Sequence, residues 1–284
     1  MAVAVIGGGW AGLAAAVTLA QHAIPVTLFE SAAQLGGRAR RVEINGMALD
    51  NGQHILIGAY RETLRLLTTV GVDVHAACYA PPLTLQVAPA FYLCAASLPA
   101  PLHLGLGLLK SRGISFREKL SAVRFLAALR LAAFQVDPNY SVSNLLAQHQ
   151  QSTALNEYLW HPLCLAALNT PVQMASAQIF VNVLHDAFFG AREDSKLILP
   201  RVNLGQLLPD PAAHFIAAHG GKIHLNQRIQ RLEVSDKGFA LHGDQGVEQF
   251  AQVICAVPPF RVHDLLGQLP SLQPLLGQIT AFQY

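Results

Sequence analysis

A glycine-rich pattern within the first thirty residues restricts the fold of this chain more than any other feature. An apolar run of four residues, Val3–Ile6, leads directly into residues 7–12, which contain the spacing Gly-x-Gly-x-x-Gly. Residues 11–22 are rich in alanine and predict a helix, and a second apolar run, Val26–Phe29, ends on Glu30. Strand, glycine turn, helix and strand in this order predict a βαβ unit with parallel strands.

Each part of this pattern has a physical task in binding a dinucleotide. Gly7 makes the tight turn, Gly9 lets the backbone approach a pyrophosphate, and Gly12 packs the helix against the strand. The helix N-terminus offers unpaired N–H groups and the positive end of a dipole to the phosphates. Glu30 follows Gly12 by 18 residues, where a carboxylate can accept hydrogen bonds from ribose hydroxyls. The pattern therefore predicts a dinucleotide site, and the alternative is a glycine turn in an unrelated α/β unit.

The residues after Glu30 indicate which dinucleotide is bound. An ordinary nicotinamide-binding unit continues into another helix and strand, whereas this chain supplies the glycine pair Gly36 and Gly37, followed by Arg38. Backbone N–H groups and a guanidinium can both approach a diphosphate. This arrangement favours FAD over a nicotinamide cofactor. The alternative for Arg38 is a solvated cation in a loop.

The chain resembles the superfamily of FAD-dependent amine oxidases and phytoene desaturases. In that superfamily a glycine pair and an arginine follow the ribose-binding acid, and a strand with an Asp-x-Gly-Gly-like motif runs beside the flavin. The matching residues are Gly36, Gly37 and Arg38 in the first motif, and Asp50, Gly52 and Gln53 in the second. The resemblance also implies that Ile229 lies on a strand that meets the adenine side of FAD, and that Ala256 lies near the cofactor.

The fold class that these features predict is α/β, with a Rossmann-like FAD-binding domain that is interrupted by a helical, mixed substrate domain. Helical periodicity dominates the middle of the chain, and strand-like segments return after residue 220. We therefore expect a discontinuous FAD-binding domain made of residues 1–75 and 195–260. Residues 76–194 and 261–284 are expected to form the substrate domain.

Two longer strings narrow the resemblance to the squalene-associated branch of the superfamily, the hydroxysqualene dehydroxylases of hopanoid biosynthesis. Residues 160–171 read WHPLCLAALNTP, and residues 50–54 read DNGQH. The resemblance implies that the hydroxyl group of a C30 polyisoprenoid, hydroxysqualene, is removed reductively to give squalene, with reduced FAD as the hydride source. It also implies a further FAD-contacting glycine motif beyond Tyr284, so the chain is expected to be truncated at its C-terminus.

Loss of the hydroxyl group from such a substrate needs a proton donor, and four residues are candidates. His54 is the first choice, because its strand should lie beside the flavin ring. Asp50, Glu157 and His161 are the others. The alternative for each is a purely structural role: His54 could pack or bond to the backbone, and His161 could cap a helix.

The composition excludes several classes of partner. Charged residues make up 13% of the chain and the formal net charge is +2, which excludes a disordered acidic chain and a basic face for nucleic acid. No two of the four cysteines, Cys78, Cys94, Cys164 and Cys255, have the CxxC spacing of a zinc site, and we expect no bound metal. Such thiols fit a reduced, cytoplasmic setting.

An uncharged stretch beside a basic one predicts a contact with a membrane surface. Residues 74–109 contain no Asp, Glu, Lys or Arg, yet five prolines prevent a single transmembrane helix. Residues 110–130 contain six basic residues and one acidic residue, Glu118, with helical apolar spacing from Phe116 onward. This combination predicts peripheral binding to the inner face of the plasma membrane through residues near 100–130. The alternative is a solvated helix face over an ordinary core.

Other functions remain open at this point. A carotenoid desaturase or a flavin amine oxidase of the same superfamily would use the flavin in the oxidative direction. Aromatic residues make up only 7% of the chain and do not cluster, whereas an amine site usually has an aromatic cage. The alternative from another class is an inactive, truncated remnant that binds lipid with a nucleotide fold.

Overall fold

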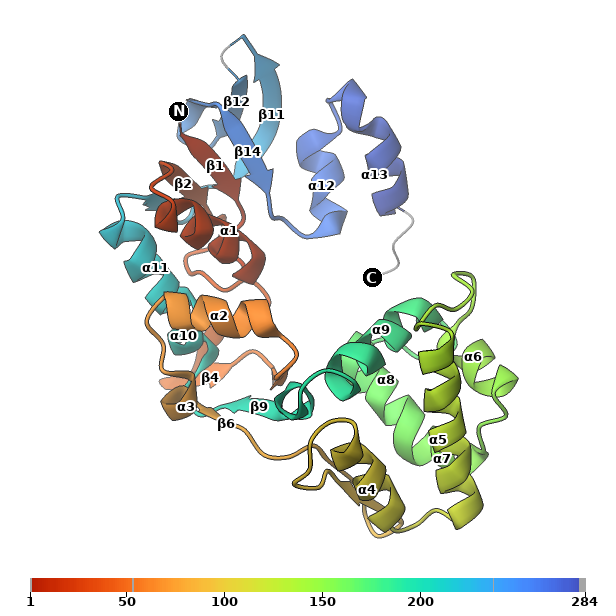
Figure 1. Ribbon diagram of the computed structural model, residues 1–284. Coiled ribbons are helices and arrows are strands. Elements are labelled where there is room, and N and C mark those ends of the chain that lie inside the picture. The colour runs from red at the N-terminus through yellow and green to blue at the C-terminus, as the bar shows by residue number, and fades with distance from the viewer. Residues whose placement is uncertain (1, 53, 237, 281–284) are drawn as a thin grey trace. The chain divides into compact units, whose positions relative to one another are not determined.

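The computed structural model describes residues 2–52, 54–236 and 238–280, and it divides into two compact units (Figure 1). Unit 1 consists of residues 1–54, 62–78 and 200–284, and unit 2 consists of residues 55–61 and 79–199. The chain therefore passes from one unit to the other four times. Each unit has a hydrophobic core of its own.

Unit 1 contains a parallel sheet with the strand order β10-β2-β1-β14. Its strands are β1 (Val3–Ile6), β2 (Val26–Phe29), β10 (Lys222–His224) and β14 (Gln252–Cys255). Val3 pairs with Val26 on one side and with Gln252 on the other. Every residue of β1 and β2 is buried, which explains why their sequences are almost continuously apolar instead of alternating.

Helix α1 (Trp10–Gln21) connects β1 to β2 and packs beside α11 (Pro209–Ala218) (Figure 1). The predicted βαβ unit is therefore present, and the α/β fold class is confirmed. The shorter elements are a hairpin of β3 (Arg41–Ile44) and β4 (Met47–Asp50) and the helices α2 (Arg61–Thr69), α3 (Val74–Ala77), α10 (Leu204–Leu207), α12 (Pro259–Leu266), η3 (Pro270–Leu272) and α13 (Gln273–Thr280).

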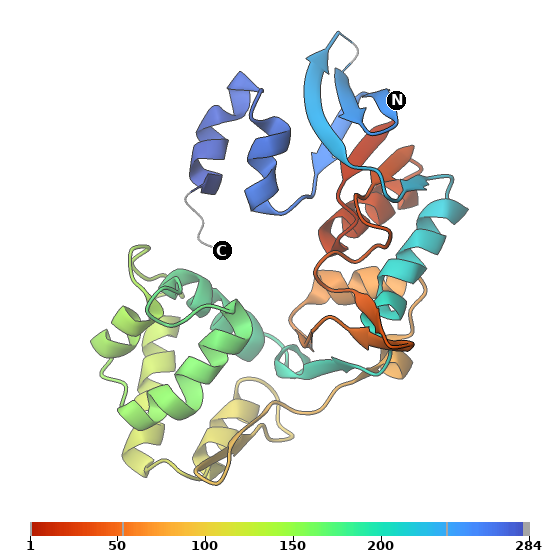
Figure 2. The same cartoon turned by 180° about the vertical axis from the view of Figure 1, so that it is seen from behind.

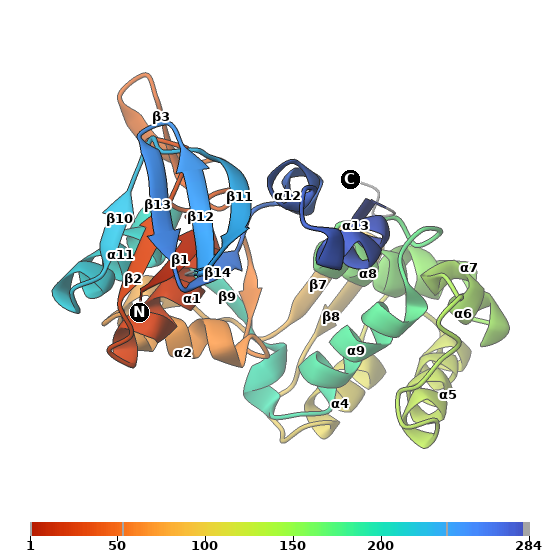
Figure 3. The same cartoon turned by 90° about the horizontal axis from the view of Figure 1, so that it is seen from above.

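A second sheet in unit 1 is antiparallel (Figure 3). Its strands are β11 (Ile229–Ser235), β12 (Gly238–Gly243) and β13 (Gly246–Phe250). Leu232 and Leu241 of this sheet are buried in one cluster with Phe29 of β2. The ring of Phe250 meets that of Phe29 edge to face, with centroids 5.7 Å apart. The antiparallel sheet and the parallel sheet therefore share a core.

The helices after residue 258 belong to unit 1, which differs from the expectation that residues 261–284 form part of the substrate domain. Helix α12 packs against β11, and Leu265 and Leu269 are buried in the same cluster as Phe29. An amphipathic helix needs an apolar surface to cover, but its sequence does not say which one. The packing on β11 decides the location.

Unit 2 is mainly helical (Figure 2). Its elements are the strand pair β5 (Leu56–Ile57) and β9 (Leu197–Pro200), the hairpin β7 (Thr84–Val87) and β8 (Phe91–Cys94), and the helices α4 (Leu102–Lys110), α5 (Phe116–Leu131), α6 (Val142–Gln148), α7 (Thr153–Leu155), η1 (Asn156–Trp160), α8 (His161–Leu168), α9 (Ala177–Phe188) and η2 (Arg192–Ser195). The short strand β6 (Cys78–Tyr79) lies where the chain enters this unit.

Serine residues begin several of these helices, as their sequences predict. The hydroxyl of Ser176 accepts a hydrogen bond from a backbone N–H of α9. At α5, Ser115 and Glu118 form a capping box, in which the Glu118 carboxylate accepts the Ser115 N–H at 2.6 Å. This bond, with those from the hydroxyls of Ser115 and Ser152, lowers the pKa of Glu118. The carboxylate of Glu118, the one acidic residue of α5, therefore stabilises the N-terminus of this helix.

Residues 153–168 form the continuous series α7, η1 and α8, with a π-helical turn in the middle. Pro162 follows that turn, and proline cannot donate the backbone hydrogen bond that an α-helix requires. The wider turn accommodates this loss. The helix ends at Asn169, whose left-handed backbone (φ 48°) terminates the series.

The core of unit 2 is formed by the largest buried side chains of its helices. The rings of Phe125 and Trp160 meet edge to face with centroids 5.1 Å apart, and Phe180 is buried in the same cluster. Across residues 2–52, 54–236 and 238–280, we find no helix with the length and apolar character needed to traverse a bilayer.

Candidate functional site

The glycine turn after β1 is packed so tightly that two of its positions exclude any side chain. Gly7 has φ +109°, and a Cβ there would lie 2.7 Å from the carbonyl oxygen of Ala256. A Cβ on Gly12 would lie 1.8 Å from the carbonyl oxygen of Gly7. The first and third glycines of the motif therefore set the close approach of α1 to β1 and β14.

The second glycine motif lies directly against the first. The N–H of Gly36 donates to the carbonyl of Gly8 at 2.8 Å, and Gly9 and Gly36 form a parallel bridge. A Cβ on Gly9 would find only the Cα of Gly37, at 3.9 Å. The space in front of the N-terminus of α1 is thus open, and in the part of the chain that the structure describes no side chain caps this helix. Such an end offers its N–H groups to an anion.

Glu30 lies at the end of β2, beside this opening. Its carboxylate accepts hydrogen bonds from the N–H groups of Gly8 at 2.6 Å and Ala32 at 2.7 Å. These bonds hold the carboxylate in place. A carboxylate has about four acceptor positions, so the side chain of Glu30 can still accept from ligand hydroxyls.

A cavity of about 1300 Å³ lies over these elements, and all the residues that line it belong to unit 1. It is large enough for a dinucleotide. The predicted residues that it brings together are Gly7, Gly9, Glu30, Gly36, Gly37, Arg38, His54, Ile229 and Ala256.

The cavity is rich in positive charge and in polar atoms without partners. Arg38, Arg40 and Arg228 line it, and within the described residues none of their side chains has an ion-pair partner. Buried Nε of Arg40 and buried Oε1 of Gln227 have no hydrogen-bond partner in the described part of the chain. Buried polar atoms are normally satisfied, so these two indicate a missing ligand. The residues present fit a diphosphate-containing cofactor.

Among the described residues, the predicted residues Gly12, Asp50 and Gly52 do not line this cavity. Gly12 is buried beneath it, as its packing role requires. Asp50 is exposed at the end of β4, and its carboxylate accepts the N–H of Leu204 at 2.8 Å, so the structure gives Asp50 a role at the start of α10. Gly52 is exposed nearby, and Gln53 falls outside the described residues.

His54 is the one predicted catalytic residue that lines the cavity. Its Nδ1 lies 3.0 Å from the carbonyl oxygen of Gly52. Because a carbonyl only accepts, Nδ1 carries the hydrogen, and Nε2 is the nitrogen that can take up or release a proton. Glu157 and His161, the other candidates, lie on η1 and α8 in unit 2 and do not line this cavity.

Sequence reasoning missed several lining residues. Arg261, Asp264 and Leu265 come from α12, which no motif of the sequence connects with the cofactor. Cys255 also lines the cavity, and burial raises the pKa of its thiol, with a partly opposing hydrogen bond from Val257. Its thiol therefore stays protonated near neutral pH and is no nucleophile.

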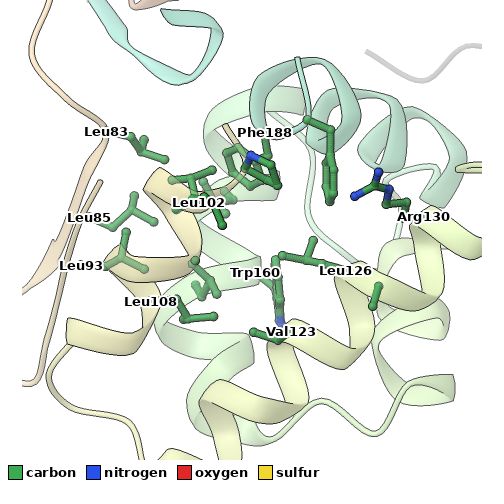
Figure 4. A pocket seen from close by; sticks show the side chains of 17 residues that line it. Leu83, Leu85, Leu93, Leu102, Leu108, Val123, Leu126, Arg130, Trp160 and Phe188 are labelled. Atoms are coloured by element: carbon green, nitrogen blue, oxygen red, sulfur yellow. The ribbon is translucent and has the colours of Figure 1, made fainter. Parts of the chain in front are cut away.

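A second cavity, of about 290 Å³, lies entirely within unit 2 (Figure 4). Seventeen residues from the β7–β8 hairpin, α4, α5, η1, α8 and the end of α9 line it, and almost all have hydrocarbon side chains. Trp160 and Arg130 are the exceptions. Part of its wall comes from the uncharged stretch 74–109, which sequence analysis singled out.

Comparison with known proteins decides the family. A family model described as flavin containing amine oxidoreductase matches residues 10–280 of the chain. The chain belongs to this family. The resemblance inferred from the glycine motifs is thereby confirmed, and the cofactor type in the family's description agrees with the flavin expected from the sequence.

Two relatives of this flavin-containing amine oxidoreductase have names that refer to hydroxysqualene and to phytoene. The hydroxysqualene dehydroxylase of Zymomonas mobilis is 27% identical over 283 residues, which cover 93% of this chain and 64% of that protein. The 15-cis-phytoene desaturase of Solanum lycopersicum is 25% identical over 272 residues, which cover 89% of this chain and 46% of that protein. The chain thus spans less than two thirds of the length of these two relatives.

A solved structure supports the fold of this family member. An oxidoreductase from Methanosarcina mazei superposes with a TM-score of 0.75 at 16% identity, covering 100% of this chain and 66% of the other. At this identity the similarity concerns the fold alone. It agrees with the Rossmann-like architecture of unit 1.

Proposed function

We propose that the protein is an FAD-dependent oxidoreductase and that unit 1 binds the cofactor in its 1300 Å³ cavity. The N-terminus of α1 and Arg38 would hold the diphosphate, and Glu30 the adenosine ribose. Gln227 and Ile229 would border the adenine side. The observation that carries this assignment is the pairing of two glycine motifs across an open helix N-terminus.

The substrate is proposed to be a polyisoprenoid, with hydroxysqualene as the favoured compound. The support is the similarity to a hydroxysqualene dehydroxylase along nearly the whole chain. A hydrocarbon offers almost nothing to hydrogen-bond, so its site must be apolar, and the unit 2 cavity is of this kind. The reaction replaces a C–OH bond by a C–H bond and releases water.

The chain's own contribution to this chemistry is a proton. When bound in its reduced form, FAD supplies a hydride to carbon. Departure of the hydroxyl group as water requires one proton, and we assign its delivery to Nε2 of His54, while the Gly52 carbonyl holds the ring through Nδ1. His54→Gln should lower turnover about a hundredfold or more.

A second candidate function is oxidative desaturation of a carotenoid precursor. It is favoured by the similarity to a phytoene desaturase, which also acts on a long isoprenoid. The direction of electron flow separates the two reactions, because dehydroxylation consumes reduced flavin and desaturation consumes oxidised flavin.

Flavin binding is tested first. Purified protein should contain a flavin that is released on denaturation and identified as FAD. Arg38→Gln should weaken FAD binding to the apoprotein about tenfold, because this guanidinium has no ion-pair partner among the described residues and can pair with phosphate. Arg65→Gln is the matched control, because Arg65 lies exposed on α2 and forms an ion pair with Glu62. Protein that binds no FAD after reconstitution overturns the proposal.

The reaction is tested anaerobically, with reduced FAD and hydroxysqualene as reactants and squalene as the measured product. Formation of squalene supports the dehydroxylase. Desaturation of phytoene or ζ-carotene by the oxidised enzyme, without squalene formation, would assign the second function instead. If the FAD-loaded protein converts none of these compounds, an inactive lipid-binding protein becomes the better description.

We also propose that unit 2 contacts the inner face of the plasma membrane through α5. At about 3.6 residues per turn, five of its residues fall on one face of the helix. This set, called here the α5 stripe, consists of Phe116, Leu120, Val123, Ala127 and Leu131. All five are exposed, and Phe116 and Leu131 are 72% and 90% exposed. The opposite face, with Phe125, packs into the core.

Basic residues border the α5 stripe on both sides. Helical geometry places Arg117 and Arg124 along one border and Arg130 along the other. Glu118, the only acidic residue, is held by the capping box. An apolar stripe between cations is complementary to an anionic lipid surface, where apolar groups insert and cations meet headgroups. Peripheral attachment of this kind lets the protein take an apolar substrate from the bilayer.

A further inference from the structure

The wall of the unit 2 cavity has one charged group, the solvent-exposed guanidinium of Arg130, which pairs with no group in the described part of the chain. Trp160 contributes an indole N–H, but this group donates to Oε1 of Gln151 at 2.9 Å. Arg130 contributes a guanidinium, for which no hydrogen bond or ion pair is found within the described residues. Figure 4 shows Arg130 on α5 at one side of the cavity, with Leu83, Leu85 and Leu93 on the opposite side.

From this geometry we propose that the unit 2 cavity is a binding site for an anionic amphiphile. The hydrocarbon chain of the ligand occupies the apolar space, and its phosphate or carboxylate group pairs with Arg130. The inference rests on the proposed function only in treating this cavity as a hydrocarbon site. The anionic amphiphile is a second ligand of that site, distinct from hydroxysqualene, whose hydroxyl group carries no charge.

The size of the cavity suits one hydrocarbon chain. Protein interiors are close-packed, and an apolar void of about 290 Å³ is far larger than ordinary packing defects. It lies at the lower end of the range of ligand pockets, about 300–1,000 Å³. The site therefore fits a single chain segment instead of a bulky ring system. Gly105 adds to this space, because a Cβ on it would meet nothing within 4 Å.

The chemistry of Arg130 favours an anion over a hydroxyl group. A guanidinium carries five N–H donors and pairs with carboxylate or phosphate through two parallel hydrogen bonds. Its nearest acid along α5, Glu118, already accepts bonds from Ser115 and Ser152. Arg124 and Arg117 on the same helix add positive charge. The cationic side chains of α5 therefore outnumber its one carboxylate beside the cavity.

The site is open to an amphiphile that comes from a lipid surface. Val123 and Ala127 line the cavity and also belong to the exposed α5 stripe. Arg130 both lines the cavity and borders that stripe. A chain that enters across the stripe would leave its charged group at the border, where an arginine can pair with it while its own stem stays on apolar surface.

The test is a calorimetric titration of the full chain with decyl phosphate, decanoate and decanol, all below their micellar concentrations. These probes share one chain and differ in the end group. Both anions should bind about tenfold more tightly than decanol at low salt. Arg130→Gln should remove that preference and leave decanol binding unchanged, whereas Arg124→Gln, a neighbour that does not line the cavity, should keep it. The ratio between the two anions separates a phosphate ligand from a carboxylate ligand.

A second variant tests the place of binding. Gly105→Leu fills the cavity from α4 without a steric conflict at Cβ and should abolish binding of all three probes while the protein stays folded. Equal affinity for decanol and both anions, or an unchanged preference in Arg130→Gln, overturns the inference and leaves the proposed enzyme intact. Conversely, anion-selective binding by a protein that binds no FAD would overturn the proposed function alone.

Discussion

At the scale of single residues, Gly12 and Gly105 form a matched pair, because both are glycines within helices. A Cβ on Gly12 would collide with the backbone of Gly7, but a Cβ on Gly105 would enter open space. Gly12→Ala should therefore destabilise the protein by about 3 kcal/mol or more and abolish FAD binding. Gly105→Ala should stabilise it by about 1 kcal/mol, as a better helix former. Urea denaturation of both variants measures the difference, and equal effects would contradict this account.

Residue-scale pH dependence is expected from His103. This side chain is 1% exposed, and its Nε2 lies 2.9 Å from the hydroxyl oxygen of Ser195. Burial, and to a lesser degree the charge of Arg192, lowers its pKa below the usual 6.5. As the pH falls below about 6.5, His103 therefore becomes protonated in the unfolded chain but stays neutral in the folded chain. Stability is complete above this pH and falls as the pH drops toward the folded-state pKa.

The measurement is the free energy of unfolding between pH 7.5 and pH 5, roughly one unit above and one and a half below the usual histidine pKa. A single proton gives a slope of at most about 1.4 kcal/mol per pH unit. Burial lowers the pKa of His149 as well, so His103→Gln should reduce the slope without removing it, and the double variant with His149→Gln should reduce it further. An unchanged slope in both variants would show that other groups control it.

The residues that could be predicted from sequence are those whose roles are local. Gly7, Gly9, Gly12 and Glu30 are separated by the lengths of one helix and two strands, so their spacing alone brings them together. Arg130 is different, because it becomes a cavity residue only when α5 packs beside α4 and α8. Arg261 and Asp264 of α12 likewise reach the nucleotide cavity through tertiary packing, for which no short pattern exists.

At the scale of elements, Lys119 connects α5 to α4. Its ammonium donates to the carbonyls of Leu109 at 2.8 Å and Ser111 at 2.7 Å, at the C-terminal end of α4. These carbonyls carry the negative end of the helix dipole. The ammonium of Lys119 is thus bound to the end of α4. The sequence had placed Lys119 among the six basic residues of 110–130 that were expected to contact a membrane.

Lys119→Met should destabilise the protein by about 1–2 kcal/mol, because it leaves two carbonyls without this donor but keeps the apolar stem. Arg117→Met is the control: Arg117 is exposed on the same helix, and its loss should change stability by less than about 0.5 kcal/mol. Chemical denaturation of both variants gives the comparison. If the two effects are equal, the bonds to α4 contribute nothing measurable.

Element boundaries were predictable where a local signal marks them, as with Ser115 before α5 and Ser176 before α9. The π-helical turn before Pro162 could not be predicted. Proline predicts a break in the α-helical hydrogen bonds, but not the type of turn that replaces them. The placement of α12 was also beyond the sequence. Its apolar face could cover several surfaces, and the contact with β11 settles which one.

At the scale of the whole molecule, the proposed membrane contact can be measured directly. Sedimentation with anionic liposomes should bring down the protein at low salt and less of it as salt rises. Changing Arg117 and Arg124 together to Glu should weaken sedimentation at least tenfold, at about 1 kcal/mol for each cation. Changing Arg65 and Lys222 to Glu alters the net charge equally but lies in unit 1, and it should have little effect. Equally poor binding to anionic and neutral vesicles would leave α5 as a solvated surface.

Because the chain passes four times between the two units, parts of unit 1 must wait during synthesis before they can fold. β1 and β2 emerge first, but the outer edges of this pair stay unpaired until β10 and β14 arrive. Val3 must wait for Gln252, about 250 residues later, which at roughly 5–20 residues per second takes about 12–50 s. Open apolar strand edges attract other chains. Residues 79–199 of unit 2 are all synthesised before β14. The parallel sheet that holds the early glycine motif is therefore completed only after unit 2 has been synthesised.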